Sequence, residues 1–498
     1  QDGAQQTVYS RNRRVEPSND FTYDALYRLI QASGREHLGQ TNGAPNPPTS
    51  PDAFNAFHTR LEHPGNGQAM GTYIERYVYD AVGNFLQMQH RGSDPAHAGW
   101  TRAYDYLEAS LTEDGSGGAP LKANNRLTRT TLNPNGANPP QVEPYQHDAH
   151  GNMVRMPHLG GGLAGPNMHW DYRDQLRQTD LGGGGAAFYV YDASGQRVRK
   201  VWEKAPGLTE ERIYLGGFEI FRKHGGPIGT NSATLERETL HVMDDKQRIA
   251  LVETRTLDAA GDDKAPRQLI RYQFGNHLGS ASLELDEQAQ IISYEEYAPY
   301  GSSTYQAVRS QTETAKRYRY TGKERDTESG LYYHGARYYA AWLGRWTAAD
   351  STFKPQFSDA YEYVRSNPII FNDPTGNEWT KFWGGVRAVG GLAQMAGGVT
   401  FAVFTAETGV GIAAGLAVAA HGLSDYEAGA RQMMSGRDER SVTEMALSSG
   451  LQAAGVEQHN ADAAAKAADI TLGFVNPTGP ISGGPRAALA LASGGQKL

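Results

Sequence analysis

Two aspartates near the end of a tyrosine-rich stretch are the residues best suited to chemistry. Asp350 and Asp373 could act together, because two carboxylates held close to one another share protons unequally. One then serves as a base for water and the other as an acid for a leaving group. Arg345 could keep one of them ionised or polarise a carbonyl. With the chain itself as the substrate, proximity would replace binding, so the set is compatible with an intramolecular aspartyl-type autoprotease.

The same two aspartates also have a purely structural interpretation. Asp-Pro and Asn-Pro sequences start turns, so Asp350 and Asp373 could be turn residues of a folded, uncut junction. They can meet only if the chain turns back between them, which Pro355 and Pro368 permit. In both interpretations, a scaffold must hold these residues in place.

A degenerate repeat fills residues 1–316 and provides that scaffold. Each copy has an aromatic residue, then Asp, a short polar turn and an alternating apolar run. The copies are FTYDALYRLIQA (21–32), YVYDAVGNFLQMQH (77–90), YQHDAHGNMVRM (145–156), MHWDYRDQLRQT (168–179) and FYVYDASGQRVRKVW (188–202). Such units are typical of β-hairpins, which must stack because no single hairpin buries its face. The fold is predicted to be mainly β, a shell of stacked hairpins, with insertion loops at 43–69 and 114–140.

Composition narrows the functional classes. The chain has 498 residues, a net charge of -8, 59 Gly, 27 Tyr and no Cys. This length exceeds one compact domain, and the charge gives no nucleic-acid signature. His277 and His334 have no second ligand at metal spacing, and the glycine-rich loops lack the context of a phosphate cradle, so neither a metal nor a cofactor is predicted. No signal peptide follows Gln1, which predicts a fragment or a processed product.

A mixed charge run precedes the candidate site. Lys323, Glu324, Arg325, Asp326 and Glu328 are expected to form cross-strand ion pairs on a solvated or lumen face.

The composition changes after Asn377. Residues 378–498 are rich in Gly and Ala and predict an α-helical segment, with hydrophobic helices over 384–422 and amphipathic helices over 423–470. The uncharged run 388–406 just reaches transmembrane length. It is compatible with a water-soluble helical hairpin and with a membrane-inserting, pore-forming segment. No catalytic set is evident in this segment.

The hairpin units resemble YD repeats, and the block YRYTGKERDTESGLYYHGARYYAAWLGRW (318–346) resembles the core of Rhs-repeat-associated proteins. That family includes the C components of insecticidal Tc toxins and polymorphic effectors of type VI secretion. The resemblance implies a spirally wound shell over 1–316 that forms part of a hollow cage. It also implies a cage plug and autoproteolysis junction over 317–377, and an enclosed pre-toxin or effector segment over 378–498.

The resemblance also assigns roles at the junction. Arg345 matches the Arg of a Leu-Gly-Arg motif, Asp350 the acid that follows it, and Asp373 the Asp of Asp-Pro-x-Gly. The implied cut lies between Asn377 and Glu378. The chain departs from the family at Asn377, where Leu is usual, and an aspartyl-protease-like site normally seats an apolar side chain there.

The implied function is toxin delivery, in which the cage releases its effector by self-cleavage. The implied protein is a bacterial effector made in the cytoplasm, then secreted or delivered into target cells during interbacterial competition. Its implied partners are a missing N-terminal shell portion or a B-type cage partner, a secretion-system component and a cognate immunity protein. One alternative is a non-catalytic YD-repeat surface or contact protein without cleavage. The other is a pore former that acts on a target membrane through 378–498.

Overall fold

The structure is a computed structural model that divides into two compact units, Gln1–Asn377 and Glu378–Leu498. In the first unit it describes residues 7–377, except 11–12, 39–58, 61–69, 96–98, 111–122, 135–138, 160–164, 205–206, 245–246, 262, 309–315 and 351–358. In the second unit it describes only scattered residues between 423 and 458, and these are helical. The rest of the helices predicted over 384–422 and 423–470 lies outside the described residues.

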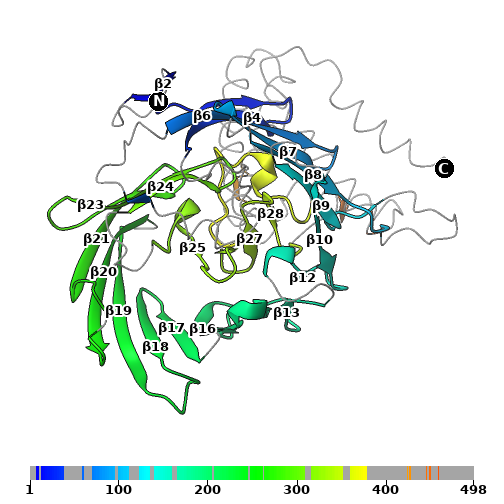
Figure 1. Cartoon of the computed structure of the whole chain (residues 1–498). Coiled ribbons are helices and arrows are strands. Elements are labelled where there is room, and N and C mark those ends of the chain that lie inside the picture. The colour runs from blue at the N-terminus through cyan, green and yellow to red at the C-terminus, as the bar shows by residue number, and fades with distance from the viewer. Residues whose placement is uncertain are drawn as a thin grey trace, which may run out of the picture. The chain divides into compact units, whose positions relative to one another are not determined.

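Two antiparallel sheets form a curved wall in the first unit (Figure 1). The smaller sheet has seven strands: β3 (Asp20–Tyr23), β4 (Leu29–His37), β6 (Met70–Tyr79), β7 (Phe85–Gly92), β8 (Trp100–Asp105), β9 (Arg129–Pro134) and β10 (Gln141–Pro144). Neighbouring strands in the sheet follow one another along the chain, as stacked hairpins require.

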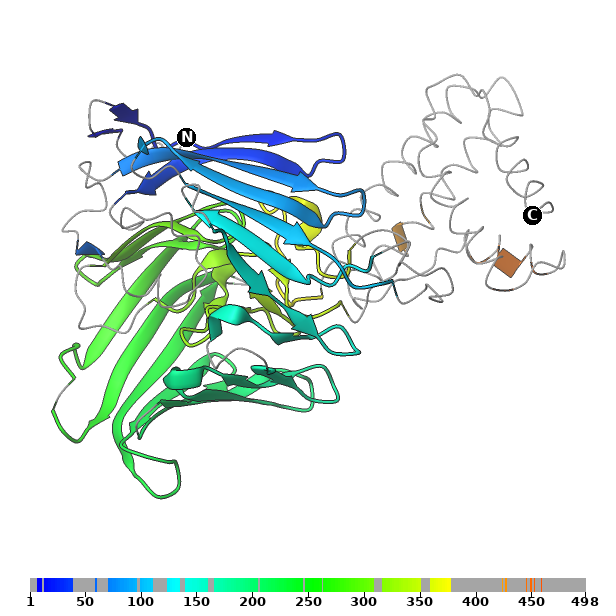
Figure 2. The ribbon, with the colours of Figure 1, turned by 45° about the vertical axis from the view of Figure 1, so that its right-hand side comes forward.

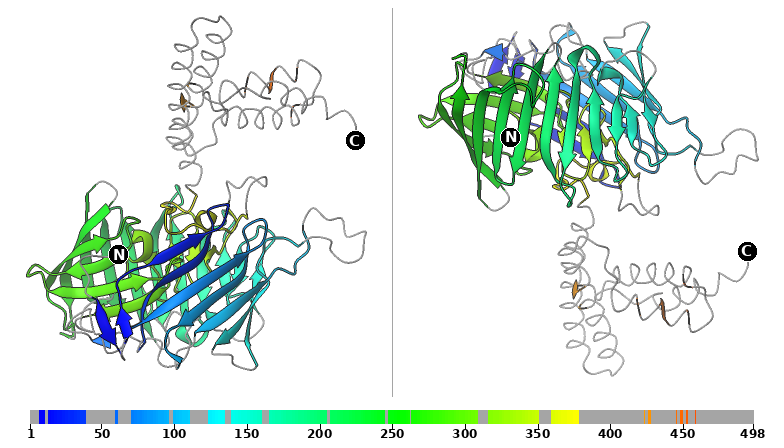
Figure 3. Two further views of the ribbon diagram at one scale, coloured as in Figure 1. Left: turned by 90° about the horizontal axis from the view of Figure 1, so that it is seen from above. Right: turned by 90° about the horizontal axis from the view of Figure 1, so that it is seen from below.

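The larger sheet has thirteen strands and continues the same meander. Its strands are β13 (Met168–Trp170), β14 (Leu176–Asp180), β15 (Ala186–Tyr191), β16 (Arg197–Lys204), β17 (Leu208–Leu215), β18 (Phe218–His224), β19 (Ala233–Asp244), β20 (Gln247–Asp258), β21 (Gln268–Gly275), β22 (Ala281–Leu285), β23 (Ile291–Tyr297), β24 (Ser303–Val308) and the short parallel β5 (Thr59–Arg60). Hairpins β1 (Val8–Ser10) with β2 (Arg13–Val15) and β11 (Gln146–His147) with β12 (Met153–Arg155) are separate. Figures 2 and 3 show the strands side by side along the wall.

The repeated aspartate makes the hairpin turns. In each predicted copy its Oδ1 accepts backbone N–H groups that follow it, at 2.8–3.0 Å, and so closes the turn through its own side chain. These residues are Asp24, Asp80, Asp148, Asp171 and Asp192. The mainly β fold predicted for this part of the chain is confirmed. The insertion predicted over 114–140 is wrong in part, because β9 lies within it and pairs with β8 over six residues.

The wall curves until its two sheets meet. Arg35 on β4 donates from Nε to Glu296 on β23 at 2.9 Å, across 261 positions of sequence. Beside this pair, His37 stacks on Tyr305 with the ring centroids 5.1 Å apart. These contacts hold β4 beside β23 and β24, so the concave side of the wall surrounds the segment that follows it (Figure 1).

Residues 317–377 are here called the plug, and those of them that the structure describes lie on the concave side of the wall. They contain the small sheet β25 (Glu324–Arg325), β26 (Tyr332–Tyr333), β27 (Tyr338–Ala340) and β28 (Arg345–Trp346). Buried plug aromatics such as Tyr339 and Trp346 share one hydrophobic cluster with wall residues such as Phe85 and Tyr104. Wall and plug therefore have a common core, and neither buries its apolar face alone.

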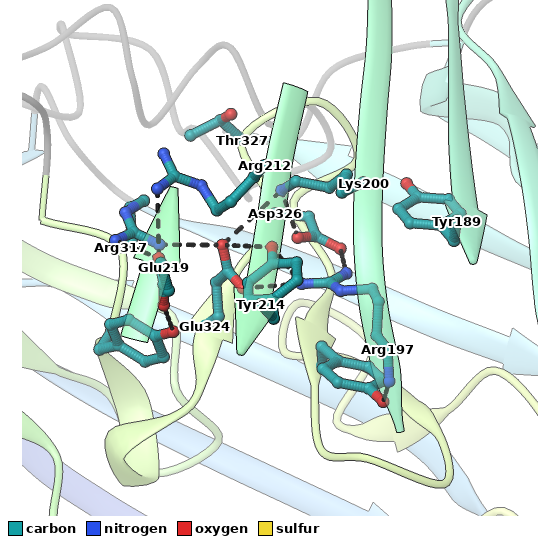
Figure 4. A network of polar contacts seen from close by, with 12 residues as sticks. Tyr189, Arg197, Lys200, Arg212, Tyr214, Glu219, Arg317, Glu324, Asp326 and Thr327 are labelled. Atoms are coloured by element: carbon teal, nitrogen blue, oxygen red, sulfur yellow. Dashed lines mark hydrogen bonds and ion pairs between the residues drawn. The ribbon is translucent and has the colours of Figure 1, made fainter. Parts of the chain in front are cut away.

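A network of buried ion pairs also joins the plug to the wall (Figure 4). Arg197 on β16 contacts Glu324 and Asp326 of the plug, each at 2.7 Å. Lys200 on the same strand contacts Asp326 at 2.6 Å and Glu328 at 3.3 Å. The charge run was expected on a solvated or lumen face. Its three acids do form ion pairs, but these pairs are buried between wall and plug.

The electrostatics of Glu324 show why this arrangement is stable. Burial opposes ionisation of the carboxyl, but the charges of Lys200, Arg197 and Arg317 outweigh burial and lower its pKa to about 2. Removal of one cation would leave the buried carboxylates with less compensating charge, which costs more than loss of an exposed pair.

Replacing Arg197 by Met should therefore lower the free energy of unfolding by about 3–5 kcal/mol, because Glu324 and Asp326 stay buried. Arg129→Met is the matched control, since the Arg129–Asp105 side chains are 48% and 35% exposed and their pair contributes at most about 1 kcal/mol. Denaturant unfolding of the full chain measures both. Equal losses in the two variants would contradict a buried network.

Candidate active site

The Asp-Pro-x-Gly sequence at the end of the plug forms a tight turn. Oδ1 of Asp373 accepts the backbone N–H groups of Thr375 at 3.2 Å and of Gly376 at 2.8 Å. Gly376 has a φ of +82°, and a Cβ on it would lie 2.9 Å from the backbone nitrogen of Arg337. Glycine is required here both by the left-handed backbone and by this close approach.

The two candidate aspartates meet at one arginine. Nη2 of Arg337 lies 3.2 Å from Oδ2 of Asp350 and 3.5 Å from Oδ2 of Asp373. The side chains of Arg337, Asp350 and Asp373 are 5%, 15% and 8% exposed. The plug therefore brings both carboxylates to the same nitrogen, in a site largely screened from water.

Arg337 is fixed by several further contacts. Its guanidinium lies 4.2 Å from the centroid of the Trp346 ring, and its Nη1 donates to the carbonyl of Ala360 at 3.2 Å. The amide of Asp350 donates to that same carbonyl at 3.1 Å. Burial lowers the pKa of Arg337, and the charges of Asp350 and Asp373 oppose that shift. The charge of one guanidinium thus faces both carboxylates at once.

Arg345, the arginine predicted for the site, lies elsewhere. Its guanidinium donates to the hydroxyl of Tyr106 at 2.5 Å and the carbonyl of Asn125 at 2.7 Å, and it contacts Asp359 at 3.3 Å. No ion pair joins it to Asp350 or Asp373, all of which the structure describes. Arg345 lies on β28, and its side chain contacts the segment between β8 and β9 together with Asp359.

Sequence reasoning missed Arg337 because spacing alone gives no reason to prefer it. Arg337 precedes β27, and only the β26–β27 turn and the return of the chain to Gly376 bring it to the aspartates. The available signal was composition: Arg337 stands in the tyrosine-rich block between Gly335 and Tyr338. Its burial could have been inferred from these neighbours, but its partners could not.

His334 supports the turn from the other side. Its Nδ1 lies 2.7 Å from the carbonyl oxygen of Asp373, and burial holds its pKa well below the usual value, so the ring is neutral. Among the residues that the structure describes, no group of three or more His, Cys, Asp or Glu side chains could hold a metal ion.

The predicted cleavage site lies at the boundary between the two units. Asn377 ends the first unit, and its backbone N–H approaches Oγ1 of Thr375 at 3.4 Å. Glu378, on the other side of the predicted cut, lies outside the described residues, as does the apolar run 388–406. No helix among the described residues is long and apolar enough to cross a membrane.

Two further acids of the plug, one buried and one partly buried, have raised pKa values. Burial raises the pKa of Asp359 to about 6, although Arg345 opposes the shift. Burial also raises the pKa of Glu362 to about 8, and a hydrogen bond from the hydroxyl of Ser366 at 2.8 Å lowers it only partly. Glu362 is therefore protonated in the folded chain at neutral pH.

Comparison with known proteins identifies relatives of the chain among toxin proteins. No protein-family model matches the chain. It is 32% identical over 382 residues to the toxin subunit YenC1 of Yersinia entomophaga, an alignment that covers 75% of this chain and 35% of YenC1. It is 26% identical over 339 residues to the toxin protein Tse5 of Pseudomonas aeruginosa, covering 61% of this chain and 24% of Tse5. The chain thus spans about a third of the length of the curated toxin subunits of Yersinia entomophaga that it matches.

Solved structures agree with these sequence relationships. A TcdB2–TccC3 structure without the hypervariable C-terminal region matches with a TM-score of 0.56 and 28% identity, over 74% of this chain and 16% of that one. A Photorhabdus luminescens Tc holotoxin pore matches with the same TM-score over 75% of this chain and 16% of that one. Fold and site define a protein whose β wall shares its core with a later segment of the same chain. Within that class, the chain is a relative of the Rhs/YD-repeat toxin proteins.

The glycine of the turn gives a test of local geometry. Gly376→Ala should destabilise the full chain more than Gly207→Ala does. Both glycines have nearly the same φ, +82° and +81°, but a Cβ on Gly207 meets nothing within 4 Å. The left-handed backbone costs about 1–2 kcal/mol in either variant, and only Gly376→Ala adds the clash with Arg337. Thermal unfolding measures the difference, and equal shifts would contradict the close approach.

The protonated Glu362 predicts a dependence of stability on pH. Between about pH 4.5 and 8 the unfolded chain releases this proton while the folded chain keeps it, so stability falls as the pH rises. Glu362→Gln removes this linkage. The melting temperature of the variant minus that of the unsubstituted chain should therefore increase from pH 5 to pH 8. A constant difference across this range would rule out a buried, protonated Glu362.

Proposed function

We propose that this chain is part of an Rhs-type toxin-delivery protein that cuts itself between Asn377 and Glu378. The observation that carries the proposal is the contact of one Arg337 nitrogen with both Asp350 and Asp373, next to the turn that leads to Asn377. Two carboxylates at a common cation, with little exposure to water, are what an aspartyl-type reaction needs. The family relationship supports it, because the relatives are named as toxin subunits and toxins.

The reaction would consume one water molecule. Asp373 already accepts two backbone N–H bonds, which favours its anion, and it takes a proton from water. The water oxygen then bonds to the carbonyl carbon of Asn377. Asp350 gives its proton to the amide nitrogen of Glu378 as the C–N bond breaks. The products are a carboxylic acid on Asn377 and an amine on Glu378, and the proton of the pair has moved from Asp350 to Asp373. The new acid then gives its proton to the amine, and Arg337 balances the single negative charge of the pair throughout.

The shell would then act as a container. We propose that the wall is part of a hollow, spirally wound cage that encloses residues 378–498, and that cleavage frees this segment as an effector. The cage would be completed by a further shell portion or a B-type partner; the matched solved structures contain TcdB2 together with TccC3. Delivery to a target cell, through a secretion-system component and against a cognate immunity protein, belongs to the same proposal.

The cleavage step can be tested with matched carboxylate-to-amide substitutions. The unsubstituted chain should give two fragments on a denaturing gel, 1–377 and 378–498. Asp350→Asn and Asp373→Asn should each give one full-length band, because the pair loses its base or its acid. Glu362→Gln is the control and should cleave normally, because Glu362 is a partly buried plug acid outside the pair.

Two outcomes would reject this function. A single full-length band from the unsubstituted chain would favour a non-catalytic YD-repeat surface or contact protein. Cleavage that persists in both Asp→Asn variants would show that another group cuts the chain. A fold check by circular dichroism separates loss of chemistry from loss of structure.

A further inference from the structure

Four successive carbonyl groups of the turn are each held by a donor from one short stretch of the plug. The donors and acceptors are His334 Nδ1 to Asp373, Lys323 Nζ to Pro374, the backbone N–H of Ala336 to Thr375 at 2.9 Å, and Arg337 Nε to Gly376 at 2.5 Å. The Ala336 donor is a backbone N–H group, and Arg337 belongs to the candidate site itself. The other two, Lys323 and His334, are side chains that the proposed chemistry does not use.

The His334 ring is locked by its surroundings. Trp346, Tyr339 and Tyr363 contact it edge-on, with ring centroids 5.0, 6.0 and 6.1 Å away. Its Nε2 is buried without a hydrogen-bond partner among the described residues, which fits a neutral ring whose proton is on Nδ1. That tautomer can donate to the carbonyl of Asp373. The three aromatic rings surround the imidazole, and the hydrogen bond to Asp373 is its polar contact among the described residues.

Lys323 holds the next carbonyl along the chain. Its ammonium donates to the carbonyl of Pro374, between the carbonyls held by His334 and Ala336. Because Pro374 has no N–H of its own, its carbonyl is the one backbone polar group through which this residue can be held. Lys323 follows directly after the 3-10 turn Tyr320–Gly322, whose buried Tyr320 anchors it in the common core.

We propose that Lys323 and His334 are positioning residues for the self-cleavage reaction, and that their bonds to Pro374 and Asp373 present the bond after Asn377 to the carboxylate pair. This inference rests on the proposed function. Neither side chain touches the reacting atoms. They act by fixing the path of residues 373–376, since a displacement of about 1 Å in a reacting group can cost about a hundredfold in rate.

The test follows the rate of self-cleavage in a cell-free translation time course of the full chain. Lys323→Met and His334→Leu remove the donated bonds and should slow cleavage about 10- to 100-fold. Lys323→Arg and His334→Asn keep a donor at the same place, because the Asn amide nitrogen corresponds to Nδ1 of His. These conservative variants should restore the rate to within about threefold.

A structural role is separated by a second measurement. Each substitution is also made in an Asp350→Asn background, where the chain stays whole and its melting temperature can be compared. Slow cleavage, rescue by the conservative variants and a melting temperature that stays close to the parent support positioning. Slow cleavage with a matching loss of melting temperature and no rescue would overturn it.

The outcomes also separate this inference from the proposed function. If the unsubstituted chain does not cleave, the proposed function fails and the inference fails with it. If it cleaves, and Lys323→Met and His334→Leu cleave at its rate, only the positioning role is overturned.

Discussion

One buried cation between two carboxylates organises the end of this chain. Arg337 contacts Asp350 and Asp373 with the same nitrogen, and its Nε holds the carbonyl of Gly376. A guanidinium suits this task because its planar array of donors can serve several acceptors at once. The contact is stable only because burial removes competing water, and burial in turn requires the wall around the plug.

The wall and the plug depend on each other for the same physical reason. Charged side chains facing the concave side would be costly without partners, and the plug supplies carboxylates for Arg197 and Lys200. The plug aromatics complete an apolar core that the hairpins cannot close alone. Polar and apolar burial thus fix the plug in one orientation, and this orientation places the Asp-Pro-x-Gly turn beside Arg337.

Much of the fold was predictable, because the repeated turn carries its own mechanism. An aspartate that caps its own turn is visible in the sequence, and five such copies predict five hairpins without knowledge of long-range contacts. β9 was not predicted, because it follows a polar insertion and no YD turn precedes it. Burial of the charge run also escaped, since a mixed run of charges is usually solvated, and only pairing with another strand explains it.

The candidate site was predictable in its acids and not in its arginine. Asp350 and Asp373 stand out by residue type, and the prolines between them permit the return of the chain. The plug holds six arginines. The choice between Arg337 and Arg345 depends on how the short strands of the plug sheet direct each side chain. Sequence spacing does not determine that, because the strands concerned are only two or three residues long.

The central claim is that Asp350 and Asp373 act on the chain that carries them. The most direct measurement is the intact mass of the purified, unsubstituted protein beside that of its Asp350→Asn variant. The account predicts two masses for the unsubstituted chain, one ending at Asn377 and one beginning at Glu378, and a single full-length mass for the variant. One full-length mass for both proteins, or a cut at another bond, would contradict it.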